Sequence, residues 1–259
     1  MHPPQPSESR LLAAVAGVLL IAVFGPPVAQ PADYHAFADA HTRWGVPHAF
    51  DVLSNLPFAL VAMVGMRRLW RLGDALDPVQ RALAWLACVG LVLTTVGSSW
   101  YHLRPDDAGL VVDRGAISVA FAGIVGLVAC RINARAGASL GLALLAAGPV
   151  AVAVWFLTGN LLPWAALQGG GMVLLVVMCF SKAVPGALPV RWGLVIAAYA
   201  VAKLLEAADH GVWQLTGEGA SGHTLKHLVA AAAAWPLVGA LGRLQARGQN
   251  RSALPPQAA

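Results

Sequence analysis

Three histidines stand in a pattern typical of a metal site. His223 and His227 are four residues apart, so on an α-helix they lie one turn apart on the same face and can present two imidazole nitrogens to one ion. His102, at the end of an earlier apolar run, supplies a third. Three neutral nitrogen ligands leave one tetrahedral position open for water, which is the pattern of a catalytic zinc site. Zinc in such a site lowers the pKa of its water toward ~7 and polarises a substrate carbonyl.

Two further polar residues accompany the histidines. Ser98 precedes His102 by one helical turn, and Asp113 begins the next apolar run. Asp113 is suited to accept a proton from the water or to orient a ligand histidine, and Ser98 to donate a hydrogen bond to a developing oxyanion. Taken singly, these residues also fit a hydrogen-bonded histidine pair, a headgroup-level histidine and a local ion pair of Asp113 with Arg114. Their common position near one end of their helices favours a joint metal site.

A second polar set lies in the segment 191–215. Lys203, Glu206 and His210 fall at i, i+3 and i+7 and so line one helical stripe, with Asp209 alongside. An internally neutralised seam that fixes helix packing and a proton relay or substrate contact are both compatible with this stripe. We expect these four residues only in a supporting position around the metal ligands.

Composition requires a membrane. The chain is 58% hydrophobic and 11% charged, with a mean hydropathy of +0.67, which excludes an ordinary soluble domain. The chain has 17 Lys and Arg against 12 Asp and Glu, a net charge of +5, and its basic residues are scattered at the ends of apolar runs. That placement suits lipid headgroups and topology, not nucleic acid. The three cysteines stand isolated in apolar stretches, so neither a disulfide nor a thiolate metal site is expected.

Eight apolar runs are long enough to cross about 30 Å of hydrocarbon. They cover residues 10–29, 50–70, 81–103, 108–130, 137–157, 161–181, 191–215 and 222–241. The expected fold is all-α, a polytopic transmembrane helical bundle with a seven-helix core at 33–242. An extra span lies within residues 1–32, and 243–259 are expected to be a disordered tail. The first span could instead serve as a signal anchor or a cleaved signal peptide.

Basic residues alternate between the connections, and this predicts the orientation. They gather after the second, fourth, sixth and eighth runs, at Arg67, Arg68, Arg71, Arg81, Arg131, Arg135, Lys182, Arg191, Arg243, Arg247 and Arg251. By the positive-inside rule both termini are cytoplasmic. The histidines and Asp113 then fall in the outer parts of their helices. We expect one shared site near the outer face of a bacterial-type inner membrane.

The order and spacing of these residues resemble the alkaline ceramidases, whose superfamily includes the progestin and adipoQ receptors and other membrane hydrolases. The resemblance covers residues 33–242. It is carried by Ser98-xxx-His102, Asp113 eleven residues later, His223-xxx-His227 in the last helix, and the stretch Ser54-Asn55-Leu56-Pro57-Phe58, which is similar to the first-helix motif of the family.

The resemblance implies a seven-helix core with zinc held by His102, His223 and His227. Asp113 would be the water-activating base, Ser98 the oxyanion helper, and the amide of a ceramide the bond cleaved. The acidic segment that binds calcium in the eukaryotic members is not matched. Only Asp39 stands at a plausible ligand position, and His48 replaces an expected acidic residue. Calcium regulation is therefore not expected, and the exact substrate does not carry over.

The leading hypothesis is a zinc-dependent hydrolase that cleaves the amide of a ceramide-like or other N-acyl lipid, which enters laterally from the bilayer. One alternative is a non-enzymatic membrane receptor or sensor in which the metal is structural. Another is a proton or metal-ion transporter that uses the polar segment 191–215. Short loops argue against a receptor, and the apolar inner halves of most spans argue against a transporter.

Overall fold

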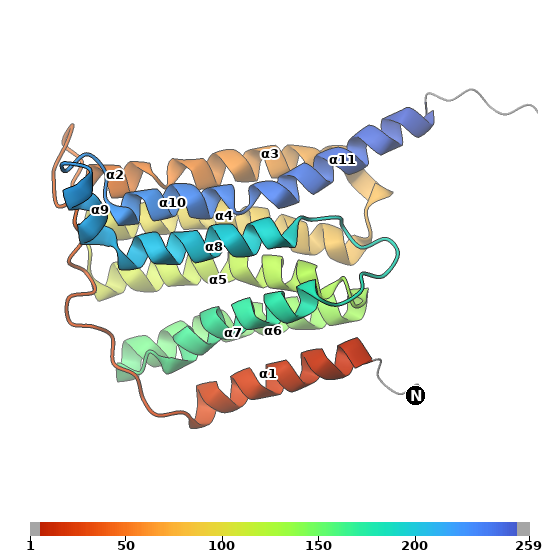
Figure 1. Cartoon of the computed structure of the whole chain (residues 1–259), viewed down its shortest axis with the longest axis horizontal. Helices are drawn as coiled ribbons and strands as arrows, with labels where there is room; N and C mark the ends of the chain where they lie inside the picture. The colour runs from red at the N-terminus through yellow and green to blue at the C-terminus, as the bar shows by residue number, and fades with distance from the viewer. Residues whose placement is uncertain (1–5, 253–259) are drawn as a thin grey trace, which may run out of the picture.

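The computed structural model describes residues 6–252, with side chains described to residue 246, and they form a bundle of helices (Figure 1). Within this range the only β pairing is two isolated bridges. The all-α prediction is confirmed. The helices are α1 (Pro6–Phe24), α2 (Ala49–Leu53), α3 (Leu56–Leu72), α4 (Pro78–Leu103), α5 (Asp107–Ala129), α6 (Ala134–Thr158), α7 (Leu162–Cys179), α8 (Trp192–Ala207), α9 (Asp209–Leu215), α10 (Gly222–Ala232) and α11 (Trp235–Ser252), with a 3-10 turn η1 (Gly73–Ala75) after α3.

Seven stretches of the described chain are long and apolar enough to cross a membrane, as expected of a multi-pass membrane protein. Two are composite, since α2, α3 and η1 form Ala49–Ala75, and α10 with α11 forms Gly222–Ala246. The others are α1, α4, α5, α6 and α7.

The structure differs from the expected single span over 191–215. Ala208 leaves the helical region (φ −98°, ψ 19°) and separates α8 from the short α9. The 16 residues of α8 rise about 24 Å, less than the roughly 30 Å of a hydrocarbon core. α8 nevertheless belongs to the bundle and packs against α10 (Figure 1).

Prolines mark the interruptions in the two composite spans. Pro57 stands in the first turn of α3, just after the turn at Ser54–Asn55, and Pro236 stands in the first turn of α11. Proline lacks a backbone N–H and therefore suits the first helical turn, where that group has no intrahelical partner. Asn55 Nδ2 donates to the Asp51 carbonyl at 2.9 Å and so satisfies a group near the α2–α3 break.

Small residues bring α4 and α5 close together. A Cβ atom on Gly90 would overlap the backbone of Ala120, and one on Gly123 would overlap the backbone of Ala87. Membrane helices use small residues in this way to let backbones approach. The pairing fixes the end of α4, which carries His102, beside the start of α5, which carries Asp113.

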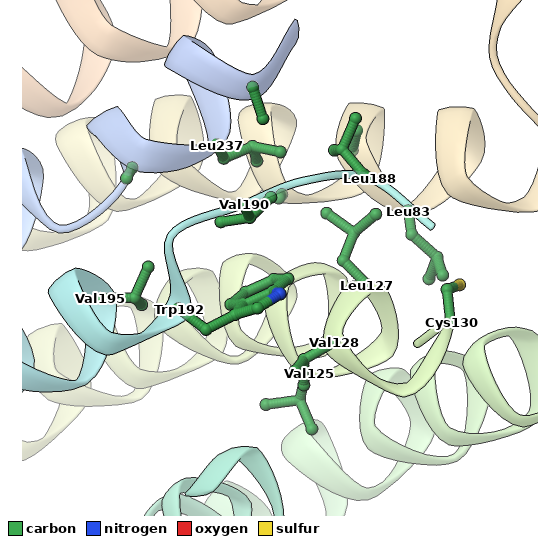
Figure 2. Close-up of a cluster of buried hydrophobic side chains, with 14 of the residues drawn as sticks. Leu83, Val125, Leu127, Val128, Cys130, Leu188, Val190, Trp192, Val195 and Leu237 are labelled. Atoms are coloured by element: carbon green, nitrogen blue, oxygen red, sulfur yellow. The ribbon is translucent and has the colours of Figure 1, made fainter. Parts of the chain in front are cut away.

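One end of the bundle has an apolar core, which we call the apolar end. The segment that connects α7 to α8 crosses it, and its Leu188, Val190 and Trp192 lie among Leu127 of α5 and Leu237 of α11 (Figure 2). Polar side chains here hold the backbone of this connection. Gln80 donates to the Gly186 carbonyl and accepts from the Leu188 N–H. Arg131 donates to the carbonyls of Met178, Cys179 and Ser181.

The two ends of the described chain lie on this same side of the bundle, at opposite edges of it (Figure 1). α1 lies at the edge of the bundle against α7 and is mostly exposed. α11 runs to Ser252, past the expected end of the last span and into the segment expected to be disordered. Residues 253–259 of that segment lie outside the described part. Cys88, Cys130 and Cys179 are free thiols.

Candidate metal centre

The three predicted histidines lie together at the end of the bundle opposite the apolar end. His102 is in the last turn of α4, and His223 and His227 are in the first two turns of α10. The Nε2 atoms of His102 and His223 are 3.2 Å apart. One ring nitrogen from each of the three residues lies within 4.8 Å of the others, and the side chains are 1%, 6% and 4% exposed. The structure therefore shows a buried three-histidine cluster that could hold a metal ion.

One nitrogen pair of the cluster has a separation that suits a tetrahedral zinc ion. Two nitrogens bound at 2.0–2.1 Å to one tetrahedral ion are separated by about 3.3 Å, and the His102–His223 separation is close to this. His102 Nδ1 is buried and has no hydrogen-bond partner among the described residues. If Nε2 binds the metal, Nδ1 is the ring nitrogen that faces away from it, so its lack of a partner does not itself indicate a metal. The set of three buried imidazoles is the feature that suits metal binding.

A serine sets the protonation of His227. The Ser54 hydroxyl donates to the Asp51 carbonyl at 3.1 Å and therefore accepts from His227 Nδ1 at 2.8 Å. The proton is then on Nδ1, and Nε2 keeps a lone pair for a metal. Metal-binding histidines are commonly oriented by such a hydrogen bond from the other ring nitrogen. Ser54 belongs to the stretch that resembled a family motif, but its role was not predicted.

Buried hydrogen bonds fix the start of α10. Ser221 caps the helix by accepting from the Thr224 N–H at 2.8 Å. The hydroxyls of Thr224 and Ser221 donate to Asp51 Oδ1 at 2.6 and 3.1 Å. α10 is thereby tied to α2, the helix that precedes Ser54.

Asp209 has a related positioning role. Its Oδ1 accepts from the backbone N–H of His223 at 2.8 Å, and its Oδ2 accepts from the N–H of Ala38 at 2.9 Å. It therefore joins the start of α9, the start of α10 and the loop before α2. Asp209 thus contacts the histidine cluster through the backbone of His223.

Ser98 and Asp113 face each other across the α4–α5 contact. Both are buried, and the Ser98 hydroxyl lies near the Asp113 carboxylate. Asp113 Oδ1 has no hydrogen-bond partner among the described residues. Ser98, Asp113 and His227 line one cavity of about 220 Å³. The predicted acid and serine thus share a space with the histidine cluster.

Lys226 is a site residue that the sequence interpretation did not single out. Its Nζ lies 3.1 Å from His223 Nε2 and 2.8 Å from Glu206 Oε1, and Glu206 is also paired with Lys203. An ammonium beside a ligand nitrogen competes with a metal ion for that lone pair. Its spacing three residues after His223 was the available signal, since i and i+3 lie on one helical face.

His210 does not continue the stripe predicted with Lys203 and Glu206. The break at Ala208 places it on α9, where it is exposed and its Nε2 contacts the carbonyl of Ala36 at 2.9 Å. It therefore holds the loop before α2 and takes no direct part in the histidine cluster.

The loop between α1 and α2 covers the histidines. The Phe37 ring centroid lies 4.6 Å from that of His102 and 4.4 Å from that of His223. His35 anchors the loop, with Nδ1 2.8 Å from the Tyr101 hydroxyl and Nε2 3.0 Å from Asp107. Access to the cluster from the loop side is therefore obstructed.

Asp39 and His48, which were considered above for calcium, belong to this loop and form hydrogen bonds that hold its backbone. The Asp39 carboxylate accepts from the N–H groups of His41 and Phe50, and His48 Nδ1 lies 2.6 Å from the Asp39 carbonyl.

Outside the spans, Asp106 caps α5 by accepting from the Gly109 N–H at 2.7 Å. This bond, with the nearby Arg104, lowers the pKa of Asp106.

Comparison with known proteins gives no family for this chain. Neither a scan against models of protein families nor a search of curated proteins found a match. The function proposed for the protein therefore rests on its residues and their geometry.

Proposed function

We propose that the protein is a zinc-dependent membrane hydrolase that cleaves the amide bond of a ceramide-like or other N-acyl lipid. The observation that supports this most is the shared cavity, which brings Ser98 and Asp113 into one space with His227 of the buried histidine cluster. A structural metal site has no need of an acid and a hydroxyl beside the metal ligands.

The residues divide into ligands and reacting groups. His102, His223 and His227 would hold zinc, for which neutral imidazole is a preferred ligand. Zinc supplies Lewis acidity, which makes water a stronger nucleophile and polarises a carbonyl. Asp113 accepts the proton of the attacking water. Ser98, which lines the same cavity, donates its hydroxyl hydrogen to the oxyanion.

The bonds balance as in any amide hydrolysis. Oxygen of water bonds to the carbonyl carbon, and the carbon–nitrogen bond then breaks. The proton held by Asp113 passes to the departing nitrogen. The products are a fatty acid and a free amine.

The cavity also suits a lipid. Much of its further lining is apolar, formed by Leu91, Ile117, Phe121, Ile124, Met172, Leu175, Val195 and Ala234. Such walls accept an acyl chain while the amide remains at the polar end. Because Phe37 covers the histidines from the loop side, entry between helices from the bilayer is the favoured route.

The experiment measures zinc and lipid turnover in the same detergent-purified samples, prepared without chelator. Wild type should hold about one zinc per chain and release fatty acid from a fluorescent ceramide or an N-acyl amino lipid. Asp113→Asn should keep the zinc and lose 10²- to 10⁴-fold in turnover, since a general base is removed. Asp74→Asn, an exposed carboxylate of η1 at the apolar end, is the control and should retain turnover.

Two outcomes would contradict the proposal. Zinc-loaded wild type that hydrolyses none of the lipids would favour a receptor or sensor with a structural metal. Metal-free wild type that cannot be loaded with zinc would remove the metal site itself.

A further inference from the structure

Arg114 is a buried cation whose hydrogen bonds are incomplete. The residue is 2% exposed and lies on α5 next to Asp113. Its Nη2 donates to the Gln30 amide oxygen at 2.7 Å, but Nε and Nη1 have no partner among the described residues. An arginine stays charged in proteins, and a buried charge without a counterion is costly. The ion pairs found in the described chain do not include Arg114.

Three aromatic rings hold the guanidinium. Its Cζ lies 4.0 Å from the ring centroid of Trp155, 5.2 Å from that of Tyr34 and 5.6 Å from that of Trp164. Rings stabilise a cation through their faces but accept no conventional hydrogen bond from its edge. They fix the plane of the group and leave N–H donors to be satisfied by something else.

Arg114 belongs to the same cavity as the proposed reacting groups. Arg114, Tyr34 and Trp164 line it together with Ser98, Asp113 and His227. Its charged lining consists of three basic residues, Arg114, Lys203 and Lys226, and two acidic ones, Asp113 and Glu206. Glu206 is already paired with both lysines. The cavity therefore has an excess positive charge, and Arg114 is the basic residue that lacks an ion-pair partner.

We propose that the cavity selects N-acyl lipids whose amine part is anionic, in particular N-acyl amino acids, and that Arg114 binds the carboxylate. This rests on the proposed hydrolase function and specifies its substrate class. In an N-acyl amino acid the carboxylate is attached to the carbon next to the amide nitrogen, so it must lie close to the reacting amide. Arg114, which adjoins Asp113 in the chain and shares its cavity, is suitably placed. A planar guanidinium matches a carboxylate in shape and charge.

The test compares three lipids that have the same acyl chain and differ in the amine part. They are N-acylglycine, the neutral N-acylglycinamide, and an N-acyl ethanolamine phosphate. Wild type should prefer N-acylglycine over N-acylglycinamide by roughly 10- to 100-fold in kcat/KM, as expected for a charged hydrogen bond. Arg114→Gln should lose that preference mainly through KM and retain turnover of N-acylglycinamide. Arg114→Lys should recover part of it.

Controls separate this proposal from failure of the hydrolase. Arg104→Gln removes an exposed arginine nearby and should change nothing. Equilibrium binding of N-acylglycine is measured beside turnover, so binding that depends on Arg114 without hydrolysis would support the carboxylate site and count against the enzyme. The comparison of N-acylglycine with N-acylglycinamide on the wild-type protein needs no variant, so it still tests the proposal if Arg114→Gln does not fold. Equal use of glycine and glycinamide lipids, or a preference for the phosphate, would overturn the carboxylate assignment.

Discussion

Each end of the bundle has an arginine that is buried or partly buried, and the two are bonded differently. At the apolar end Arg131 donates to three backbone carbonyls of the connection after α7. The opposite end carries the histidine cluster, and we call it the metal end. There Arg114 makes one hydrogen bond, to Gln30, and two of its nitrogens have no partner among the described residues. An unpaired buried polar group costs free energy, so a chain keeps one where something else will pair with it.

The neighbours of each arginine extend this contrast. Gln80 at the apolar end is bonded through both its amide oxygen and its nitrogen, although the indole N–H of Trp192 there has no partner. At the metal end His102 and Asp113 each retain a buried atom without a partner in the described chain. Polar groups at the apolar end hold the backbone, whereas those at the metal end are arranged to receive a ligand.

The contrast predicts its largest effect at His102. His102→Ala should reduce bound zinc from about one per chain to near zero, because two remaining imidazoles hold the ion weakly. The fold should persist, since the change removes a side chain that has an unpaired nitrogen. Elemental analysis and the midpoint of thermal unfolding check the two statements. His210→Ala, which changes an exposed histidine of α9, should keep its zinc. Full zinc content in His102→Ala would break the assignment.

A smaller effect is expected at Ser54. Ser54→Ala removes the acceptor of the His227 Nδ1 proton, and loss of such a partner typically weakens metal binding by 10- to 100-fold. Competition with a chromophoric zinc chelator measures the change. Ser54→Thr, which keeps a hydroxyl, should retain more affinity than the alanine variant. Equal affinities in all three proteins would mean that the hydrogen bond does not orient the ligand.

At the apolar end the effect on zinc should be smallest. Arg131→Met leaves the carbonyls of Met178, Cys179 and Ser181 without their donor, which should cost roughly 1–3 kcal/mol of unfolding free energy. Thermal unfolding should shift down while zinc per chain and lipid turnover in the folded protein stay unchanged. A variant that unfolds normally but loses zinc would show that the two ends are coupled.

Local patterns in the sequence were sufficient for much of this architecture. The long apolar runs identified the membrane helices, and the spacing of His223 and His227, with His102 at a helix end, identified the cluster. Spacing of this kind is informative because helical geometry converts it directly into position. The predicted orientation, with the cluster toward the outer face, and the enzymatic activity stay predictions.

Features that depend on distant contacts were not predictable in the same way. The break at Ala208 follows no proline or glycine, and Asp209 beside it is bonded to Ala38 and His223, which are remote in sequence. The bond of Ser54 to His227 joins residues 173 positions apart. In the sequence, Arg114 fitted a local ion pair with its neighbour Asp113, whereas the fold surrounds it with aromatic rings from three other segments.

The most direct test of the metal centre is X-ray absorption at the zinc edge on the detergent-purified, zinc-loaded protein. Three imidazole nitrogens at about 2.0–2.1 Å and one further light-atom ligand are predicted, with the imidazole contribution reduced in any zinc that His227→Ala retains. A spectrum with sulfur ligands, or one of hydrated zinc without imidazole, would contradict the assignment of His102, His223 and His227 as the ligands.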